Sequence, residues 1–354
     1  MQNLALITIV LATMLGSTTL IAQEQEEDNL HSYTRNEEHI HLADDYKGVE
    51  IHNQHGEIEI TAWLKDTILI KIETIVMAEY RDMANEVFDR LNINQTTLEG
   101  MAFMRTAFDE EFHSSFPFRI NYEVFMPADK KIIIDNRFGN VTITDITAKM
   151  DIKLEYGNLT QSGLQEADTI IANLSFGEAQ FNKINHAEAE IYNSGVKIES
   201  VHSAVISGKY CQIDIGDAGS LDFSNHTARI NVNRVENLNI NGQFCFVSVN
   251  ELTNQGKVEI SDGLLITTLS EQTSAFSVFN KNAPANITIS PKLSYTLHGE
   301  VTDGNFRHDN QHLFKTISEP NKISFSGESV SENKEMATLI LFNRNAGINI
   351  KTKK

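Results

Sequence analysis

The chain contains 354 residues, of which 41% are hydrophobic and 22% are charged, and this balance is typical of a folded protein. The formal net charge of −19 disfavours binding to nucleic acid and to anionic membrane surfaces, because both select basic proteins. A single hydrophobic core seldom grows beyond about 250–300 residues. The length therefore predicts either two domains or a repeat protein that grows in one direction.

The N-terminal residues are typical of a secretory signal peptide. A nearly unbroken apolar run covers residues 4–15, and small residues follow it. This run is shorter than the ~20 residues that a membrane-spanning helix needs. We therefore predict an exported protein of the periplasm or the outer cell surface, with a signal peptide over residues 1–22 and a flexible leader over residues 23–45.

Residues 46–127 are predicted to form an N-terminal β cap that carries one helix. Apolar residues alternate with polar ones around Val49, Ile58 and Ile68, as expected of half-buried strands. The helix is predicted over residues 80–91, because apolar residues recur there at intervals of three and four. These apolar residues are Tyr80, Met83, Ala84, Val87, Phe88 and Leu91.

A glycine-containing turn recurs through residues 128–270, and a short alternating strand follows each turn. The first four such glycines are 18, 20 and 18 residues apart. Glycine supplies the positive φ that tight turns require. A period near 20 residues predicts a β-solenoid of 18–20-residue repeats that share one linear core, and not a β-propeller, whose blades need ~40–45 residues. The predicted turn glycines are Gly56, Gly139, Gly157, Gly177, Gly195, Gly242 and Gly263.

Residues 271–354 are predicted to be strands that cover the C-terminal end of an all-β chain. A solenoid needs both of its ends covered, so the residues before Pro127 are assigned as one cap and this tail as the other. The segment 345–350 restores the turn-and-strand pattern. Further strand patterns cover residues 287–289, 294–297, 322–325 and 338–342.

The two cysteines are predicted to be free thiols. Cys211 and Cys245 are 34 residues apart, which corresponds to two repeats of 17. Equivalent positions two strands apart lie ~9.6 Å from each other, and a disulfide needs Cα atoms within about 7 Å. Both residues are therefore expected to be small members of the core.

These features resemble the bacterial putative-adhesin family, adhesin-like β-solenoid domains related to auto-transporter adhesin heads, in a form similar to envelope proteins of Bacteroidetes-type bacteria. The resemblance covers roughly residues 46–350. It rests on the segment 49–72, the single helix, the segment 122–143 and the glycine-turn repeats, in that order. The resemblance implies a β-solenoid at the cell envelope and brings no catalytic residues.

The sequence contains no phosphate-binding loop, nucleophile elbow or zinc-protease motif, so we predict no catalytic residue and no cofactor. Two weaker patterns stay open. Asp214, Asp217 and Asp222 can be the carboxylates of a glycosidase, or simply turn residues. Four histidines can be surface residues or metal ligands, although no obvious ligand set is complete and we predict no metal site. They are His39, His41, His52 and His55.

An aromatic residue precedes three of the turn glycines. Phe138, Tyr156 and Phe176 form the candidate contact surface, because exposed rings can stack on sugars or anchor a partner. The alternative, which we favour, is a ladder of rings that pack on one another along the solenoid.

The sequence thus predicts a non-enzymatic exported envelope protein, an adhesin-like β-solenoid that presents a rigid surface for binding or scaffolding. The predicted partner is an unknown protein or glycan of the cell envelope, not nucleic acid, and no membrane span is expected in the mature chain. Two alternatives stay open, a periplasmic scaffold or sensor in envelope-stress signalling and a carbohydrate-active enzyme built on a β-helix.

Overall fold

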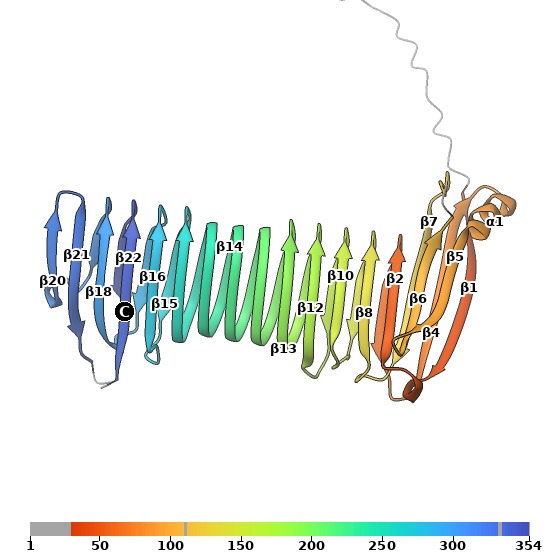
Figure 1. Cartoon of the computed structure of the whole chain (residues 1–354), viewed down its shortest axis with the longest axis horizontal. Helices are drawn as coiled ribbons and strands as arrows, with labels where there is room; N and C mark the ends of the chain where they lie inside the picture. Colours follow the sequence, from red (N-terminus) through yellow and green to blue (C-terminus); the bar gives the residue numbers. More distant parts are fainter. Residues whose placement is uncertain (1–29, 110–111, 332–334, 354) are drawn as a thin grey trace, which may run out of the picture.

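The computed structural model describes residues 30–109, 112–331 and 335–353. The predicted signal peptide, residues 1–22, and residues 23–29 of the predicted leader lie outside the described residues. Within the described part of the chain the protein is all-β, with 23 strands and one α-helix, α1 (Arg81–Arg90). The strands stand side by side in one elongated stack, and α1 lies at its N-terminal end (Figure 1).

Neighbouring strands form two rows along the stack. β13 (Glu178–Tyr192) belongs to both rows, since its first part pairs with β11 and its later part with β12, and β14 (Gly195–Ser261) continues both rows. From the N-terminal end, the first row contains β5 (Leu91–Leu98), β6 (Met101–Phe108), β2 (Gly48–Gln54), β8 (Lys131–Arg137), β10 (Met150–Glu155) and β12 (Ala167–Ser175) and, beyond β14, β16 (Ala275–Lys281), β22 (Met336–Arg344), β18 (Ser294–Thr302), β21 (Lys322–Ser329) and β20 (Phe314–Glu319). The second row contains β1 (His31–Leu42), β4 (Thr67–Ala78), β7 (Phe118–Met126), β3 (Ile58–Ala62), β9 (Val141–Thr144) and β11 (Leu159–Ser162) and, beyond β14, β15 (Leu264–Leu269), β17 (Ala285–Ile289), β23 (Ile348–Thr352) and β19 (Phe306–His308).

In the middle of the stack the paired strands are parallel and link residues 17 to 20 positions apart. Glu178 pairs with Gly195, and Leu159 pairs with Ala179. This is the spacing at which the turns recur in the sequence, so each passage of the chain lies on the previous one. We call one passage through both rows a layer.

Inward-facing side chains form columns of stacked apolar residues that make up the core. One column consists of Ile51, Ile134, Ile152 and Ala172, which are paired strand to strand and are each 2% exposed or less. The residues between them face outward, as the two-residue period of a strand requires. Burial of apolar surface, at about 25 cal/mol per Å², makes this shared core the main stabilising element.

At both ends the order of the strands in space departs from their order in the chain. β2 lies between β6 and β8, and β22 lies between β16 and β18. The cap assignment made from the sequence differs from this arrangement, because β2, β3, β22 and β23 are inner layers. Antiparallel pairs occur toward the ends instead, β4 with β1 and β7 at one end and β21 with β18 and β20 at the other. Hydrogen bonding between strands does not depend on their separation in the chain, so strand patterns alone could not reveal this order.

The prediction of a flexible leader is wrong for residues 31–45. β1 pairs antiparallel with β4 along all of its 12 residues, and the short 3-10 helix η1 (Ala43–Asp45) follows it. β1 forms one edge of the stack and carries Arg35, Glu37 and Glu38, in keeping with the charges that natural edge strands use against aggregation. Such a strand shows little apolar alternation, so its sequence resembles that of a polar linker.

Other expectations are confirmed. The helix expected over residues 80–91 is α1, and it buries Ala84, Val87 and Phe88. The strand patterns expected in the tail fall in β17, β18, β21, β22 and β23. None of the helices among the described residues has the length and apolar character needed to cross a membrane.

Candidate binding surface

The backbone at the turns differs from the expectation. The positive φ belongs to the residue before the glycine, since φ is 60° at Phe138, 57° at Tyr156 and 59° at Phe176. The amide N–H of each of these residues donates to a carbonyl of the next layer, for example Tyr156 N to Ser175 O at 3.0 Å. This interlayer bond helps to hold a residue with a side chain in a conformation that glycine adopts more easily.

The glycines are needed because layers approach closely at the turn. A Cβ at Gly139 would lie 1.9 Å from Gly56 O, and a Cβ at Gly157 would lie 2.1 Å from Gly139 O. Gly177 and Gly263 meet the carbonyl oxygen of the preceding layer in the same way, at 1.8 and 2.0 Å. The sequence therefore located these four turns correctly but assigned the wrong role to the glycine.

Two of the predicted turn glycines do not occupy this position. Gly195 pairs with Glu178, one residue beyond the equivalent of Gly177, and a Cβ there would have only an ordinary contact of 3.6 Å. Gly242 precedes the positive-φ residue Phe244 by two positions, and a Cβ at Gly242 would lie 2.7 Å from Cys245 Sγ. Gly242 thus makes room for a thiol and not for a backbone carbonyl.

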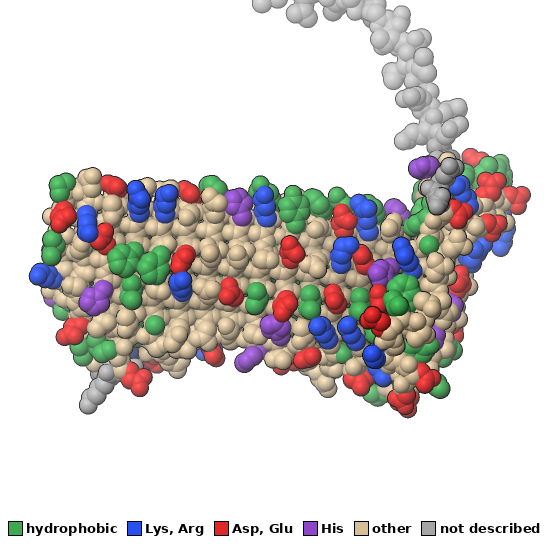
Figure 2. Space-filling view, in the orientation of Figure 1, with side chains coloured by type: hydrophobic (Ala, Val, Ile, Leu, Met, Phe, Trp, Pro, Cys, Tyr) green, Lys and Arg blue, Asp and Glu red, His purple; other side chains and the backbone are tan. Residues whose placement is uncertain are grey.

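The aromatic residues of the candidate contact surface form a ladder. Ring centroids are 5.2 Å apart for His55 and Phe138, 5.1 Å for Phe138 and Tyr156 and 4.8 Å for Tyr156 and Phe176, with the planes within 13° of parallel. Rings in edge-on contact continue the ladder along later layers, through Tyr192, Tyr210, His226 and Phe244. Figure 2 shows hydrophobic side chains and histidines interspersed with basic and acidic residues along one long edge of the stack.

Stacking changes what these rings can contact. Tyr156 has one face against Phe138 and the other against Phe176, so no face of this ring remains for a sugar. The rings are nevertheless 42%, 42% and 38% exposed at Phe138, Tyr156 and Phe176, through their edges. The ladder interpretation therefore accounts for the geometry, and where the rings stack face to face on both sides, as at Tyr156, a partner can contact only the ring edge.

A second surface, which sequence reasoning missed, is a polar groove of 800 Å³ on the outer side of the second row. It crosses six layers in β11, β13 and β14. At ~4.8 Å per layer the groove is ~24 Å long. Each of its two sides is a column of outward-facing residues from successive layers. One column contains Thr160, Gln180, Lys197, Asp214, Asn231 and Ser248, and the other contains Ser162, Asn182, Glu199, Gly216, Asn233 and Asn250.

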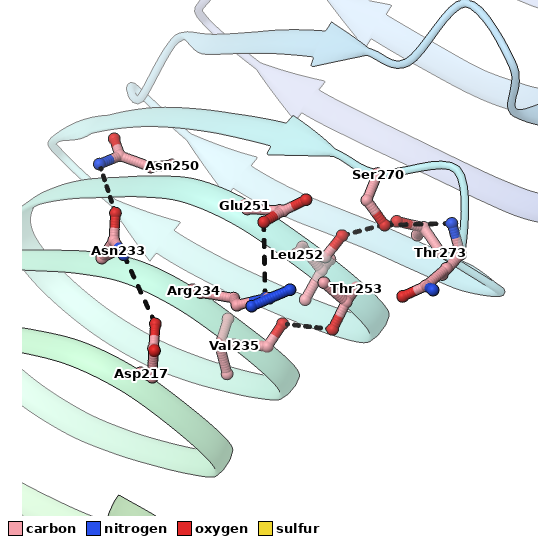
Figure 3. A network of polar contacts seen from close by, with 11 residues as sticks. Asp217, Asn233, Arg234, Val235, Asn250, Glu251, Leu252, Thr253, Ser270 and Thr273 are labelled. Atoms are coloured by element: carbon pink, nitrogen blue, oxygen red, sulfur yellow. Dashed lines mark hydrogen bonds and ion pairs between the residues drawn. The ribbon is translucent and has the colours of Figure 1, made fainter. Parts of the chain in front are cut away.

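Side chains within a column hydrogen-bond from layer to layer. Asn231 Nδ2 donates to Asp214 Oδ1 at 2.7 Å, and Asn250 Nδ2 donates to Asn233 Oδ1 at 3.4 Å. Figure 3 shows Asn233 and Asn250 on successive layers of β14, preceded by Asp217, which lies outside the groove. These bonds restrict the rotamers of the four groove residues that make them, so their polar groups are held in place before any ligand arrives.

The three predicted carboxylates lie beside side-chain amide groups, and Asp214 is also part of the groove. Both oxygens of Asp214 accept hydrogen bonds, from Gln212 at 2.8 Å and from Asn231, and Asp222 accepts from Asn239 at 3.1 Å. Asp217 lies 3.5 Å from Asn233 Nδ2. Amide donors from neighbouring side chains thus explain these aspartates as structural residues.

The four histidines do not gather at one place. His52 Nε2 lies 2.8 Å from Glu50, His55 belongs to the aromatic ladder, and His41 packs edge-on against Tyr46 at 4.8 Å. The structure places His39 3.8 Å from Glu37. Among the described residues, no group of three or more His, Cys, Asp and Glu side chains is close enough to hold a metal ion.

Both cysteines are free and buried, as the spacing argument predicted. Burial raises the pKa of the Cys211 thiol to about 11 and also raises the pKa of Cys245. Cys211 Sγ lies 3.5 Å from Asn225 Oδ1, in the layer between the two thiols. A thiol with a raised pKa is a poor nucleophile at neutral pH, so neither residue suits catalysis.

No family model matches the sequence, and no curated protein matches it. Solved structures do match. This chain resembles putative adhesins. One from Parabacteroides distasonis ATCC 8503 is 14% identical with a TM-score of 0.33, and the match covers 90% of this chain and 97% of that one. A putative cell adhesion protein from Clostridium sporogenes ATCC 15579 is 11% identical with a TM-score of 0.21, covering 91% of this chain and 100% of that one. A putative lipid binding protein, also from Parabacteroides distasonis ATCC 8503, is 8% identical with a TM-score of 0.31, covering 90% and 96%.

Proposed function

We propose that this protein is an exported, non-enzymatic envelope protein whose β-solenoid presents a rigid surface for binding a partner. In this proposal residues 1–22 are the signal peptide, residues 128–270 form the solenoid together with the inner strands β2, β3, β22 and β23, and the strands beyond these close its ends. The observation that carries the proposal is the polar groove, where two columns of hydrogen-bonding side chains are held in register over six layers.

The arrangement of the groove favours binding over catalysis. Hydrolysis of a glycosidic bond needs two carboxyl groups on opposite sides of that bond, one of which must donate a proton. The groove carries only two carboxylates, and Asp214 uses both of its oxygens to accept amide hydrogen bonds. Fixed amides and hydroxyls supply the donors and acceptors that recognition of a polar ligand requires.

The test compares two double variants for binding to envelope material. Gln180→Ala with Lys197→Ala removes two exposed and directly paired side chains of the groove. Glu190→Ala with Ser207→Ala removes an equally exposed pair of the same two layers in the first row, and it is the matched control. Polysaccharide and protein fractions of a bacterial envelope would be passed separately over each immobilised protein.

We expect one fraction to bind wild type and the control alike, and to bind the groove variant at least tenfold more weakly. A charged and a neutral hydrogen bond together contribute about 2–4 kcal/mol when a polar ligand uses them. Equal binding to all three proteins, or binding to none, would remove the support for the proposal.

A further inference from the structure

We infer that the polar groove binds an extended glycan lengthwise, and that it selects uncharged or amine-bearing chains over anionic ones. This inference rests on the proposed function and names the ligand class of the same surface. The groove runs along the stack, so its long axis crosses strands at a regular spacing. A surface that repeats the same side-chain positions layer after layer suits a ligand that is itself an extended and repeating chain.

The outward side chains of the groove favour a glycan over a protein. Protein interfaces owe most of their binding energy to Trp, Tyr, Arg and large apolar residues in desolvated pockets. The twelve outward positions here hold amides, hydroxyls, one Lys, two carboxylates and one Gly, without an aromatic or aliphatic side chain. Amides and hydroxyls pair directly with sugar hydroxyl groups, which both donate and accept.

Strand addition by a peptide is also disfavoured at this surface. The groove lies on the face of the second row, where β11 already pairs with β9 and β13, and β13 pairs with β11 and β14. The backbone N–H and C=O groups there are engaged with neighbouring strands. A peptide would therefore lack the main-chain hydrogen bonds that give such complexes their affinity.

The charges of the groove determine which glycan fits. Glu199 is exposed in a column where the next layer contributes Gly216, which places no side chain beside it. A Cβ at Gly216 would lie 2.1 Å from Glu199 O, so the two backbones are close-packed here and Gly216 cannot carry a side chain without moving them. A protonated amine of a sugar can approach the exposed Glu199 carboxylate over Gly216 and pair with it. The groove holds one cation, Lys197, against two carboxylates, Asp214 and Glu199. An anionic chain would therefore meet a surface with an excess of negative charge on a protein of net charge −19.

The experiment uses three hexasaccharide probes of equal length, a chitin-type hexasaccharide, its fully de-N-acetylated form and an oligogalacturonate. Binding to the full mature chain is measured by calorimetry at mildly acidic pH, where the free amines are protonated. A chitin-type disaccharide tests the requirement for length. Glu199→Gln tests the charge, and Glu190→Gln, on the first row, is the matched control.

We expect the de-N-acetylated hexasaccharide to bind most tightly and the chitin-type hexasaccharide about tenfold more weakly. The oligogalacturonate should bind at least a further tenfold more weakly. A tenfold change in affinity corresponds to one modest charge interaction. Glu199→Gln should abolish the difference between the first two probes, whereas Glu190→Gln should preserve it. The disaccharide should bind more weakly than the hexasaccharide.

The outcomes separate this inference from the proposed function. Binding of none of the three probes, or tightest binding of galacturonate, overturns the inference. If an envelope protein binds wild type and loses affinity for the groove variant, the binding function stands and the glycan assignment falls. If neither glycan nor protein distinguishes the groove variant from wild type, both fall.

Discussion

Gly139 lies directly against Gly56, one layer away in space and 83 residues away in the chain, so that a Cβ on Gly139 would be 1.9 Å from the Gly56 carbonyl oxygen. The preceding residues, Phe138 and His55, stack with ring centroids 5.2 Å apart. One turn thus combines a close backbone approach with an aromatic contact. Both features repeat along the stack, and each leads to a test.

Substitution of a turn glycine should depend on its place in the layer. At Gly157 a Cβ would lie 2.1 Å from Gly139 O, so Gly157→Ala should lower stability by about 1–3 kcal/mol, the usual cost of overpacking. At Gly195 the nearest atom would be Glu178 Cγ at 3.6 Å, so Gly195→Ala should be neutral or slightly stabilising. The urea unfolding midpoints of the two variants measure this difference. An equal decrease of both midpoints would contradict the one-residue offset between Gly195 and the equivalent of Gly177.

Removal of an aromatic ring should lower the free energy of unfolding more where the rings stack face to face. Tyr156 and Tyr210 have similar φ, 57° and 56°, and similar exposure, 42% and 48%. Tyr156 stacks between rings at 5.1 and 4.8 Å, whereas the neighbours of Tyr210 are edge-on at 6.3 and 6.4 Å. Tyr156→Ala should therefore destabilise by about 1 kcal/mol more than Tyr210→Ala, from the lost stacking. Thermal unfolding followed by near-ultraviolet circular dichroism measures this difference, and an inverted order would refute it.

Stability should fall as the pH drops below the ordinary pKa of histidine. His308 is buried, its Nε2 lies 2.9 Å from Tyr295 Oη, and its Nδ1 accepts from Asn310 N at 3.0 Å. Burial lowers the pKa of His308, against the opposing effect of Asp309. The unfolded chain therefore binds a proton at this histidine more readily than the folded chain does. The contribution of neutral His308 to the free energy of unfolding is fully present above about pH 6.5 and is lost as the pH falls below that value.

The check is the pH dependence of the urea midpoint between neutral and mildly acidic conditions. His308→Gln should flatten this dependence, because the titrating group is gone. His312→Gln changes an exposed histidine of the same region and should leave the slope as in wild type. An unchanged slope in His308→Gln would show that other groups cause the effect.

The thiols should resist alkylation in the folded protein. With the pKa of Cys211 raised to about 11, the thiolate fraction at pH 8 is about a hundredfold lower than for an ordinary cysteine. Iodoacetamide labelling followed by mass spectrometry should modify both cysteines rapidly in urea and neither in buffer. Rapid labelling of Cys211 in buffer would contradict its burial.

Much of the architecture was predictable from local patterns. Alternation of apolar residues located the strands, intervals of three and four located α1, and the recurrence of the turns indicated the spacing at which strands pair. These signals are local, because each residue only has to face inward or outward or fit a turn. The aromatic ladder was predictable for the same reason, since like residues at one repeat position must come together.

The tertiary structure alone decided the rest. The placement of β2 and β22 inside the ends depends on which strands pair, and any strand edge offers the same hydrogen bonds. Gly195 illustrates the same limit, because a shift of one residue in register removes it from the close contact that Gly177 makes. The polar groove was not visible in the sequence either, since Gln180, Lys197 and Asp214 form a surface only when successive layers bring them into one column. The local sequence determined which residues form strands, turns and the helix. Long-range strand pairing determined which of these segments lie side by side.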